Sequence, residues 1–393
     1  MDAIAPAAIG LEAVSKRYDD GTVAVQELDL AVPRGELVVL VGPSGCGKST
    51  TLRMVNRLIE PSSGRILLEG EDVTHADPVA LRRRIGYVIQ QVGLFPHLTI
   101  RANVATVPRL LGWNQRRTAE RVDELLSLVG LDPAAHGDRY PHQLSGGQRQ
   151  RVGVARALAA DPPVLLMDEP FGAVDPVVRE RLQDEFRRLQ RSVGKTVLFV
   201  THDIDEAVRL GDRIAVLAEG GRLHQYDAPA TLLGVPATPF VAEFVGADRG
   251  LRRLAVTPVT ASDLEHPAAV LDEDRLSVAA ERLRSGGTRW AVVLDRDGGL
   301  HGWVSLDDCR GEGTVGERVR RMAAWVRVGS SLRDAFGQLL QHDAGWVGVL
   351  DERDGYLGVL TPATLHEALR RSLEADVTGQ NRAEVELPTV RRA

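Results

Sequence analysis

The segment Gly42–Thr50 constrains the fold of this chain more than any other part of the sequence. It reads Gly-Pro-Ser-Gly-Cys-Gly-Lys-Ser-Thr and fits the phosphate-loop pattern G-x-x-x-x-G-K-S/T. Its glycines let backbone N–H groups turn inward around phosphate oxygens, and the helix that follows adds its positive end. In this pattern Lys48 reaches the β- and γ-phosphates of a nucleotide, and the Ser49 hydroxyl holds Mg²⁺. The order of the glycines excludes a dinucleotide-binding fingerprint.

The segments around this motif alternate between strand and helix patterns. Three continuous apolar runs predict strands buried on both faces, as in a parallel sheet: 36–41, 164–168 and 196–200. Apolar residues recur at helical spacing in 47–59 and 118–130, and we expect Thr118 to cap the second of these helices. Strands that alternate with helices predict an α/β fold.

The composition excludes several classes of protein. The 393 residues carry a formal net charge of −6, which argues against a protein built around nucleic-acid binding. Two distant cysteines, Cys46 and Cys309, indicate no disulfide framework. We find no apolar run long enough to span a membrane, and the first ten residues lack the basic region of a signal peptide. Lysine is rare: of 48 basic residues, three are lysines, at positions 16, 48 and 195.

Two further segments carry chemistry that fits a phosphate loop. The run 164–169 ends on Asp168, which can steady Mg²⁺ through water, and Glu169, which can polarise an attacking water. Paired carboxylates after a buried strand are unusual, because unpaired buried charge is unfavourable. Residues 144–148 read Leu-Ser-Gly-Gly-Gln at the start of a helical run, and this pattern fits either a second anion site or a simple helix cap.

Over about residues 9–245 the chain resembles the ATP-binding subunits of ABC transporters, with the motifs of that family in their usual order. The resemblance implies a phosphate-loop ATPase domain with a helical subdomain at about 92–160. It implies that Glu169 and His202 are catalytic, His202 as the switch histidine that contacts the γ-phosphate. It also implies a set of ATP contacts: Tyr18 stacked on adenine, then Gly42, Pro43, Ser44, Gly45, Cys46, Gly47, Lys48, Ser49, Thr50 and Gln90.

The same resemblance implies a working assembly of two copies. Mg²⁺ is held by Ser49, Asp168 and Gln90, a glutamine that fits the family spacing better than Gln91. Two chains close head to tail, so that each ATP lies against the signature motif of the other copy: Ser145, Gly146, Gly147 and Gln148. Residues 172–175 match the D-loop, with Asp175 as its acidic residue. Closure follows ATP binding, hydrolysis reopens the pair, and the region 91–110 passes the motion to membrane subunits.

A repeat with an offset of 56 residues follows the ATPase region. It aligns without a gap from Val270 to Ser305, and it pairs Trp290 with Trp346. Each copy is expected to contain helix, strand, tight turn (Asp297-Gly298 and Asp354-Gly355), strand and helix. The repeats resemble a tandem CBS module, about 256–311 and 317–373. The resemblance implies that Asp308 contacts a nucleotide ribose, while Thr364 replaces the corresponding Asp in the second copy, and a purely structural module stays open.

An ABC ATPase domain (1–245) joined to a CBS module (246–373) resembles the uptake systems for quaternary-amine osmoprotectants such as glycine betaine, carnitine and choline. This implies a homodimer on the cytoplasmic face of the membrane, two permease subunits and an extracytoplasmic binding protein. An importer ATPase for another solute, or a soluble non-transport ABC ATPase, are the alternatives. Residues 251–393 hold 19 arginines, no lysine and 22 acidic residues, which does not favour salt sensing at an anionic membrane. We expect 374–393 to be a flexible tail.

Overall fold

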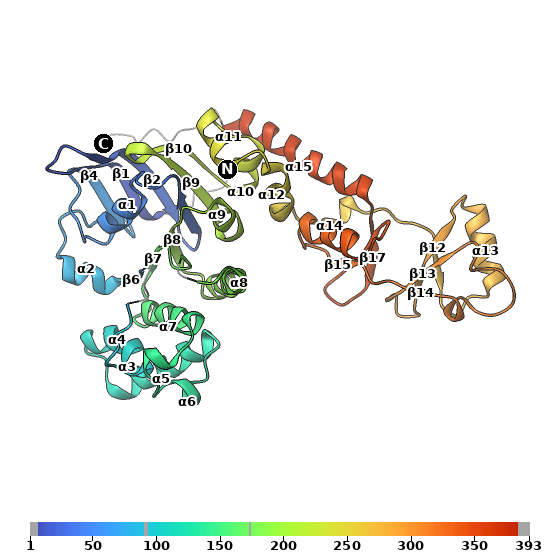
Figure 1. The fold of residues 1–393 in the computed structure, drawn as a ribbon, viewed down its shortest axis with the longest axis horizontal. Coiled ribbons are helices and arrows are strands. Elements are labelled where there is room, and N and C mark those ends of the chain that lie inside the picture. The colour runs from blue at the N-terminus through green and yellow to red at the C-terminus, as the bar shows by residue number, and fades with distance from the viewer. Residues whose placement is uncertain (1–6, 90–92, 173, 384–393) are drawn as a thin grey trace. The chain divides into compact units, whose positions relative to one another are not determined.

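The computed structural model describes residues 7–89, 93–172 and 174–383 (Figure 1). The chain divides into two compact units: unit 1 comprises Met1–Leu232 and Pro236–Gly246, and unit 2 comprises Leu233–Val235 and Ala247–Ala393. The sequence predicts an ATPase domain over 1–245 and a CBS module over 246–373.

Unit 1 is built on a mainly parallel sheet of six strands in the order β10-β9-β3-β8-β7-β6. Its strands are β3 (Leu37–Val41), β6 (Ile85–Val88), β7 (Val164–Asp168), β8 (Thr196–Val200), β9 (Arg213–Ala218) and β10 (Arg222–Asp227). Only β10 runs antiparallel to its neighbour. Every residue of β3, β7 and β8 is buried, which confirms the three strands expected from their continuous apolar runs.

A second, antiparallel sheet in unit 1 has the order β2-β1-β4-β5. Its strands are β1 (Ala7–Arg17), β2 (Val23–Pro33), β4 (Ser63–Leu68) and β5 (Glu71–Asp72). One hydrophobic core includes residues of both sheets and of helix α1 (Lys48–Val55). The phosphate loop therefore starts from a strand that is fixed on both of its faces.

Two details of the expected helices are wrong. Helix α1 ends at Val55 rather than near 59, because Arg57 adopts a left-handed backbone with φ of 47° and Leu58 turns outward to 44% exposure. Helix α5 (Gln115–Leu128) begins before Thr118, because the Asn114 side chain accepts a hydrogen bond from the Arg117 N–H at 2.8 Å and caps it. Thr118 instead lies buried in the first turn.

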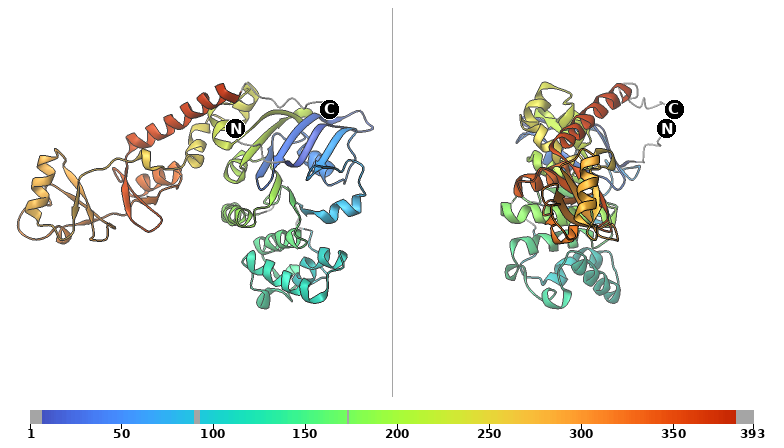
Figure 2. Two further views of the ribbon diagram at one scale, coloured as in Figure 1. Left: turned by 180° about the vertical axis from the view of Figure 1, so that it is seen from behind. Right: turned by 90° about the vertical axis from the view of Figure 1, so that its right-hand side faces the viewer.

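The remaining helices of unit 1 fall into two groups. Helices α3 to α7 gather around α5, away from β1 and β2, in a part of the unit that corresponds to the expected helical subdomain (Figure 1 and Figure 2). Their bounds are α3 Ile100–Val104, α4 Thr106–Leu110, α6 Pro133–His136, the 3₁₀ turn Pro141–Gln143 and α7 Gly146–Leu158. The others are α2 Pro78–Arg84, α8 Pro176–Val193, α9 Ile204–Leu210, the 3₁₀ turn Glu219–Gly221, α10 Pro229–Gly234 and α11 Pro239–Val245.

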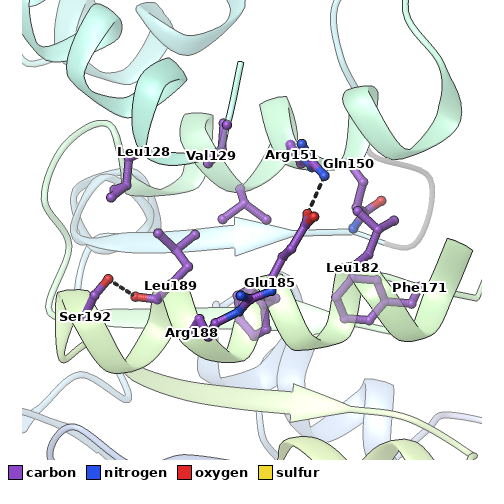
Figure 3. A pocket seen from close by; sticks show the side chains of 13 residues that line it. Leu128, Val129, Gln150, Arg151, Phe171, Leu182, Glu185, Arg188, Leu189 and Ser192 are labelled. Carbon is purple, nitrogen blue, oxygen red and sulfur yellow. Dashed lines mark hydrogen bonds and ion pairs between the residues drawn. The ribbon is translucent and has the colours of Figure 1, made fainter. Parts of the chain in front are cut away.

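A crevice of about 520 Å³ lies between α5, α7 and α8 (Figure 3). Its walls are mostly apolar and include Val154, Phe171, Leu182 and Phe186. One ion pair crosses it, from Arg151 on α7 to Glu185 on α8. This ion pair links α7 to α8 across the crevice.

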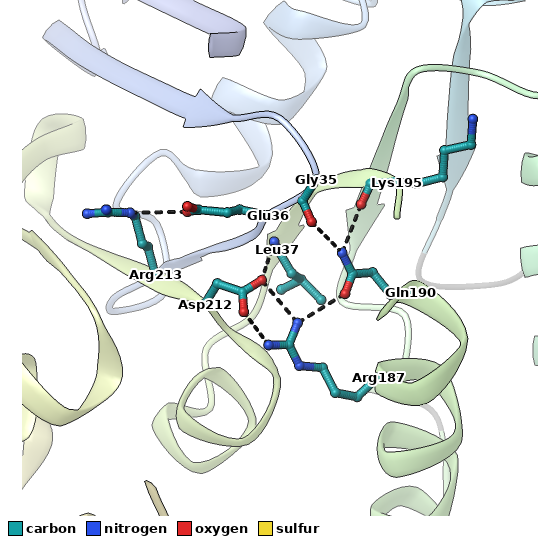
Figure 4. Close-up of polar contacts among 8 residues, drawn as sticks. All are labelled: Gly35, Glu36, Leu37, Arg187, Gln190, Lys195, Asp212 and Arg213. Carbon is teal, nitrogen blue, oxygen red and sulfur yellow. Dashed lines mark hydrogen bonds and ion pairs between the residues drawn. The ribbon is translucent and has the colours of Figure 1, made fainter. Parts of the chain in front are cut away.

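Helix α8 is fastened to the amino ends of the central strands by polar contacts (Figure 4). The Arg187 guanidinium binds both carboxylate oxygens of Asp212, and Asp212 Oδ2 accepts from the Leu37 N–H at 2.8 Å. Gln190 Nε2 donates to the carbonyl oxygens of Gly35 and Lys195, each at 2.9 Å. These contacts fix the order of β3, β8 and β9 beneath the helix, at the sheet edge opposite the phosphate loop.

Unit 2 contains the expected repeat. The first copy comprises β11 (Ala269–Leu271), α13 (Leu276–Ser285), β12 (Trp290–Leu294) and β13 (Leu300–Ser305), and the second comprises β15 (Trp325–Arg327), α14 (Leu332–Gln341), β16 (Val347–Leu350) and β17 (Tyr356–Leu360). The two copies of the repeated tryptophan, Trp290 and Trp346, stack with ring centroids 4.6 Å apart. The repeat therefore brings its equivalent residues together.

The turns and the end of unit 2 add two details. Asp295 and Asp351 accept backbone N–H bonds within their turns, and the left-handed residues are Gly298 and Asp354, which are 56 positions apart. Helix α15 (Pro362–Ala383) continues past 374, so the first part of the expected tail is helical. The other elements are α12 Arg249–Val256, β14 Arg320–Arg321 and the 3₁₀ turns Ala261–Asp263 and Val315–Glu317.

Candidate active site

The phosphate loop joins the end of β3 to the start of α1. Gly42, Gly45 and Gly47 have φ of 155°, 82° and 96°, which only glycine adopts without strain. A Cβ on Gly42 would clash with the Leu217 carbonyl oxygen, and one on Gly47 would clash with the Ala24 carbonyl oxygen. The loop is therefore held by neighbouring backbone in the curved form that a phosphate requires.

Lys48 is 6% exposed and points back over the loop. Its Nζ donates to the carbonyl oxygens of Gly42 at 2.7 Å and Pro43 at 2.8 Å. Cys46 Sγ lies 3.7 Å from the same ammonium, and burial raises the pKa of this thiol. The cation is thus placed at the mouth of the loop, among acceptors for which phosphate oxygens can substitute.

Ser49 and Asp168 meet at the same edge of the sheet. Ser49 Oγ donates to Asp168 Oδ1 at 2.8 Å, and Asp168 is 9% exposed at the end of β7. A hydroxyl and a carboxylate are hard oxygen ligands of the kind Mg²⁺ prefers, with waters and phosphates completing the shell. Among the described residues, no group of three His, Cys, Asp or Glu side chains is placed so that it could hold a metal ion.

Glu169 and His202 are brought together from the ends of neighbouring strands. His202 Nδ1 lies 3.1 Å from Glu169 Oε1, and the Glu169 N–H donates to the Val200 carbonyl oxygen at 3.0 Å. Glu169 has a left-handed backbone with φ of 44°, a conformation that turns the chain at the end of β7. The carboxylate is 22% exposed and His202 is 60% exposed, so a water can reach both side chains.

Ser145 caps helix α7. Its Oγ accepts from the Gln148 N–H at 3.2 Å, and Gln148 Oε1 accepts from the Ser145 N–H at 2.9 Å, which together form a capping box. Ser145 and Gly146 are exposed. The cap that the sequence allowed is therefore present, and it leaves the positive end of a 13-residue helix facing outward.

The remaining expected site residues lie outside the cluster around the phosphate loop or outside the described residues. Tyr18 is 40% exposed just after β1, and the Asp175 carbonyl oxygen accepts from the Arg179 N–H at the start of α8. Gln90 and Gln91 lie outside the described residues, as does Ala173 of the expected D-loop. No role for Lys16 or Lys195 follows from the sequence. In the structure, Lys195 Nζ contacts Asp161 Oδ1 at 2.9 Å, and its hydrogen bond lowers the pKa of that carboxyl.

Asp308 in unit 2 is held within its own fold. Its Oδ2 accepts from the Ser305 N–H and hydroxyl at 3.0 and 2.6 Å, and its Oδ1 accepts from Arg320 at 2.8 Å. The hydrogen bond from Arg320 lowers the pKa of Asp308 to about 2. A ribose hydroxyl at this position would have to share the carboxylate with Arg320.

Known proteins with the same arrangement identify the family. The family profile described as "ABC transporter" matches residues 25–172, and the "CBS domain" profile matches 261–312. The Bacillus subtilis glycine betaine/carnitine/choline transport ATP-binding protein OpuCA is 46% identical, over 94% of this chain and 98% of its own length. The chain belongs to the family of ABC transporter ATP-binding proteins. It is an ATP hydrolase of the ABC type, as its motifs implied.

Two further likenesses support this assignment. The Salmonella typhimurium osmoprotectant import ATP-binding protein OsmV is 47% identical, over 86% of this chain and 89% of its own length. The dimeric structure of the bacterial ABC transporter cassette MJ0796 matches with a TM-score of 0.50 and 36% identity, over 56% of this chain and 98% of that one. Within the described residues of this ABC ATPase, no helix is both long enough and apolar enough to cross a membrane.

Proposed function

We propose that this ABC ATPase is the energy-coupling subunit of an importer for quaternary-amine osmoprotectants such as glycine betaine, carnitine or choline. The observation that carries the proposal is the extent of the likeness to the Bacillus subtilis protein. That likeness covers 94% of the chain, so it includes unit 2 as well as the ATPase unit. An ATPase domain alone is common to importers of many solutes, whereas its combination with a CBS unit restricts the class of solute that this chain helps to import.

Each site residue has a task in ATP hydrolysis that its surroundings support. Lys48 binds the β- and γ-phosphates from its position over the loop, and Glu169 orients the attacking water and accepts its proton. His202 holds the Glu169 carboxylate and contacts the γ-phosphate. Mg²⁺, when held by Ser49, Asp168 and Gln90, supplies positive charge that neutralises the phosphate oxygens.

Two copies of the chain complete the site. The exposed N-terminus of α7, with Ser145 and Gly146, binds the ATP held by the phosphate loop of the other copy. The proposed homodimer agrees with the dimeric state of the MJ0796 cassette. Two permease subunits and an extracytoplasmic binding protein complete the importer, with this chain peripheral at the cytoplasmic face. Unit 2 regulates transport through its CBS pair, with Asp308 as the candidate nucleotide contact.

Reconstituted transport tests the substrate class. The chain would be assembled with a permease and a binding protein from its own genome, in vesicles supplied with ATP and Mg²⁺ on the side of this chain. We expect ATP-dependent uptake of labelled glycine betaine, choline or carnitine, with each amine competing for the others. A Lys48→Met chain is the control, since it lacks the phosphate-binding cation. Uptake of a different solute, with none of the three amines transported or competing, would contradict the proposal.

Regulation through unit 2 is tested separately. Trp346→Ala removes the ring that stacks on Trp290 and so loosens the contact between the repeats. If the CBS pair gates transport by ionic strength, this variant and the native chain have different curves of uptake against salt. Identical curves would leave unit 2 with a structural role only.

A further inference from the structure

Lys16 and Tyr18 lie together where the chain leaves β1. The Lys16 ammonium stands over the Tyr18 ring, with Nζ 5.3 Å from the ring centroid. A cation at this distance is attracted by the negative face of an aromatic ring. Tyr18 is 40% exposed, which leaves ring surface available to a further group. The lysine therefore restrains the orientation of the ring while leaving part of it uncovered.

A second contact fixes the same ammonium. Lys16 Nζ donates to the Glu60 carbonyl oxygen at 2.8 Å. Glu60 lies in the segment just after α1, the helix that begins in the phosphate loop. Ser62 in this segment is also bonded to β1: its N–H donates to the Ser15 carbonyl oxygen at 2.8 Å, and its Oγ accepts from the Arg17 N–H at 3.0 Å. Lys16 thus links Tyr18 to the exit of the phosphate-loop helix.

We propose that Lys16 is a positioning residue for the base of ATP, acting through Tyr18. By holding the ring on one side and the Glu60 segment on the other, it sets the distance between the stacking surface and the phosphate loop. A ring that is already held loses less freedom when a base stacks on it, so the base binds more tightly. The inference rests on the proposed stacking role of Tyr18.

The residue type agrees with this geometry. The chain uses arginine for nearly all of its basic positions, yet it keeps lysine here. A compact ammonium can point one N–H at a carbonyl oxygen while its charge lies over a ring, and guanidinium spreads its charge over a planar fork. Lys195 also contacts an acceptor, Asp161, but it lies just before β8, at the end of that strand opposite the phosphate loop, and it provides a matched control.

ATP hydrolysis by five variants of the full chain tests the inference. A cation–π contact at an exposed site corresponds to about a two- to fivefold change in affinity, so Lys16→Met is expected to raise KM for ATP by that factor. The kcat stays unchanged, because Lys48 and Glu169 are not altered. Lys16→Arg keeps the charge, but its planar guanidinium does not reproduce both contacts of the compact ammonium, so its KM should fall between the native value and that of Lys16→Met. Lys195→Met leaves KM unchanged.

Tyr18→Ala separates this inference from the role of Tyr18 itself. We expect it to raise KM at least as much as Lys16→Met, and the double variant to raise KM no further than Tyr18→Ala alone, since both changes remove one unit. A raised KM for Tyr18→Ala with a native KM for Lys16→Met would overturn the role of Lys16 only. A native KM for Tyr18→Ala would overturn the stacking role of Tyr18, and the inference with it. Equal losses of kcat and melting temperature in Lys16→Met and Lys195→Met would show a structural link alone.

Discussion

Replacement of Glu169 by glutamine is the sharpest test of the active site. The two side chains have the same shape, and the amide oxygen can keep the contact that His202 Nδ1 makes at 3.1 Å. The change therefore removes the negative charge and the proton acceptor while leaving the geometry in place. A positioned general base contributes about 10²- to 10⁴-fold to rate, so kcat should fall by that factor, or about 3–5 kcal/mol in the barrier.

Binding of ATP should survive the same change. In the proposed mechanism Lys48 and the phosphate loop bind the phosphates, and the two hydrogen bonds that fix Lys48 over the loop, to the carbonyl oxygens of Gly42 and Pro43, do not use the Glu169 carboxylate. The assay measures phosphate release at saturating ATP. It is paired with an equilibrium measurement of ATP binding and with the mass of the protein in the presence of ATP, which reports whether two copies associate. Glu180→Gln, on the exposed face of α8, is the matched control and should hydrolyse ATP at the native rate. A Glu169→Gln chain that keeps a tenth or more of native kcat would refute the assignment of Glu169.

Two further predictions concern the frame that holds the site. Asp212→Asn removes the charge from the bonds between Asp212 and Arg187, and it should lower the free energy of unfolding of unit 1 by about 1.5–3 kcal/mol. In a melting experiment, the unfolding transition of unit 1 is the one that ATP shifts to higher temperature. Burial alone would raise the pKa of Asp212, but hydrogen bonds from Arg187 and from the Leu37 N–H hold it below its usual value. The stabilisation by the charged carboxylate is therefore present at neutral pH and is lost as pH falls below about 4. The Asp212→Asn variant should not show this loss. Gly47→Ala forces a Cβ against the Ala24 carbonyl oxygen and should abolish ATP binding measured by calorimetric titration. In Gly45→Ala the new Cβ meets no atom within 4 Å, so ATP should still bind, with a binding free energy weaker by about 1–3 kcal/mol because alanine is strained at positive φ. Equal effects of the two substitutions on ATP binding would contradict this account.

The sequence predicted the central sheet and the phosphate loop because both follow from local pattern. Strands β3, β7 and β8 are buried along their whole length, so each appears as an unbroken apolar run. The phosphate loop combines glycines that need positive φ with a lysine and a serine at fixed spacing. The meeting of Ser49 with Asp168 also follows, since the carboxyl ends of parallel strands share one edge of a sheet.

Contacts between distant residues account for most of what the sequence did not predict. Lys16 gave no signal of its own, because its partner is a backbone carbonyl 44 residues away. The antiparallel sheet was not predicted, since β1 pairs with β2 and β4 through several irregular registers that blur the alternation of its side chains. The end of α1 was misplaced because one left-handed residue, Arg57, overrides a helical apolar pattern.

The CBS unit shows how a motif residue can have a local task that needs no ligand. In the first repeat the Asp308 carboxylate accepts from the Ser305 N–H, and the Asp308 N–H donates to the Ser305 hydroxyl. In the second repeat Thr361 and Thr364 exchange the same two bonds. Threonine can therefore serve the turn as well as aspartate does. What aspartate adds is the charge that Arg320 binds, so a nucleotide effect on this ATPase would act through that ion pair rather than through the turn.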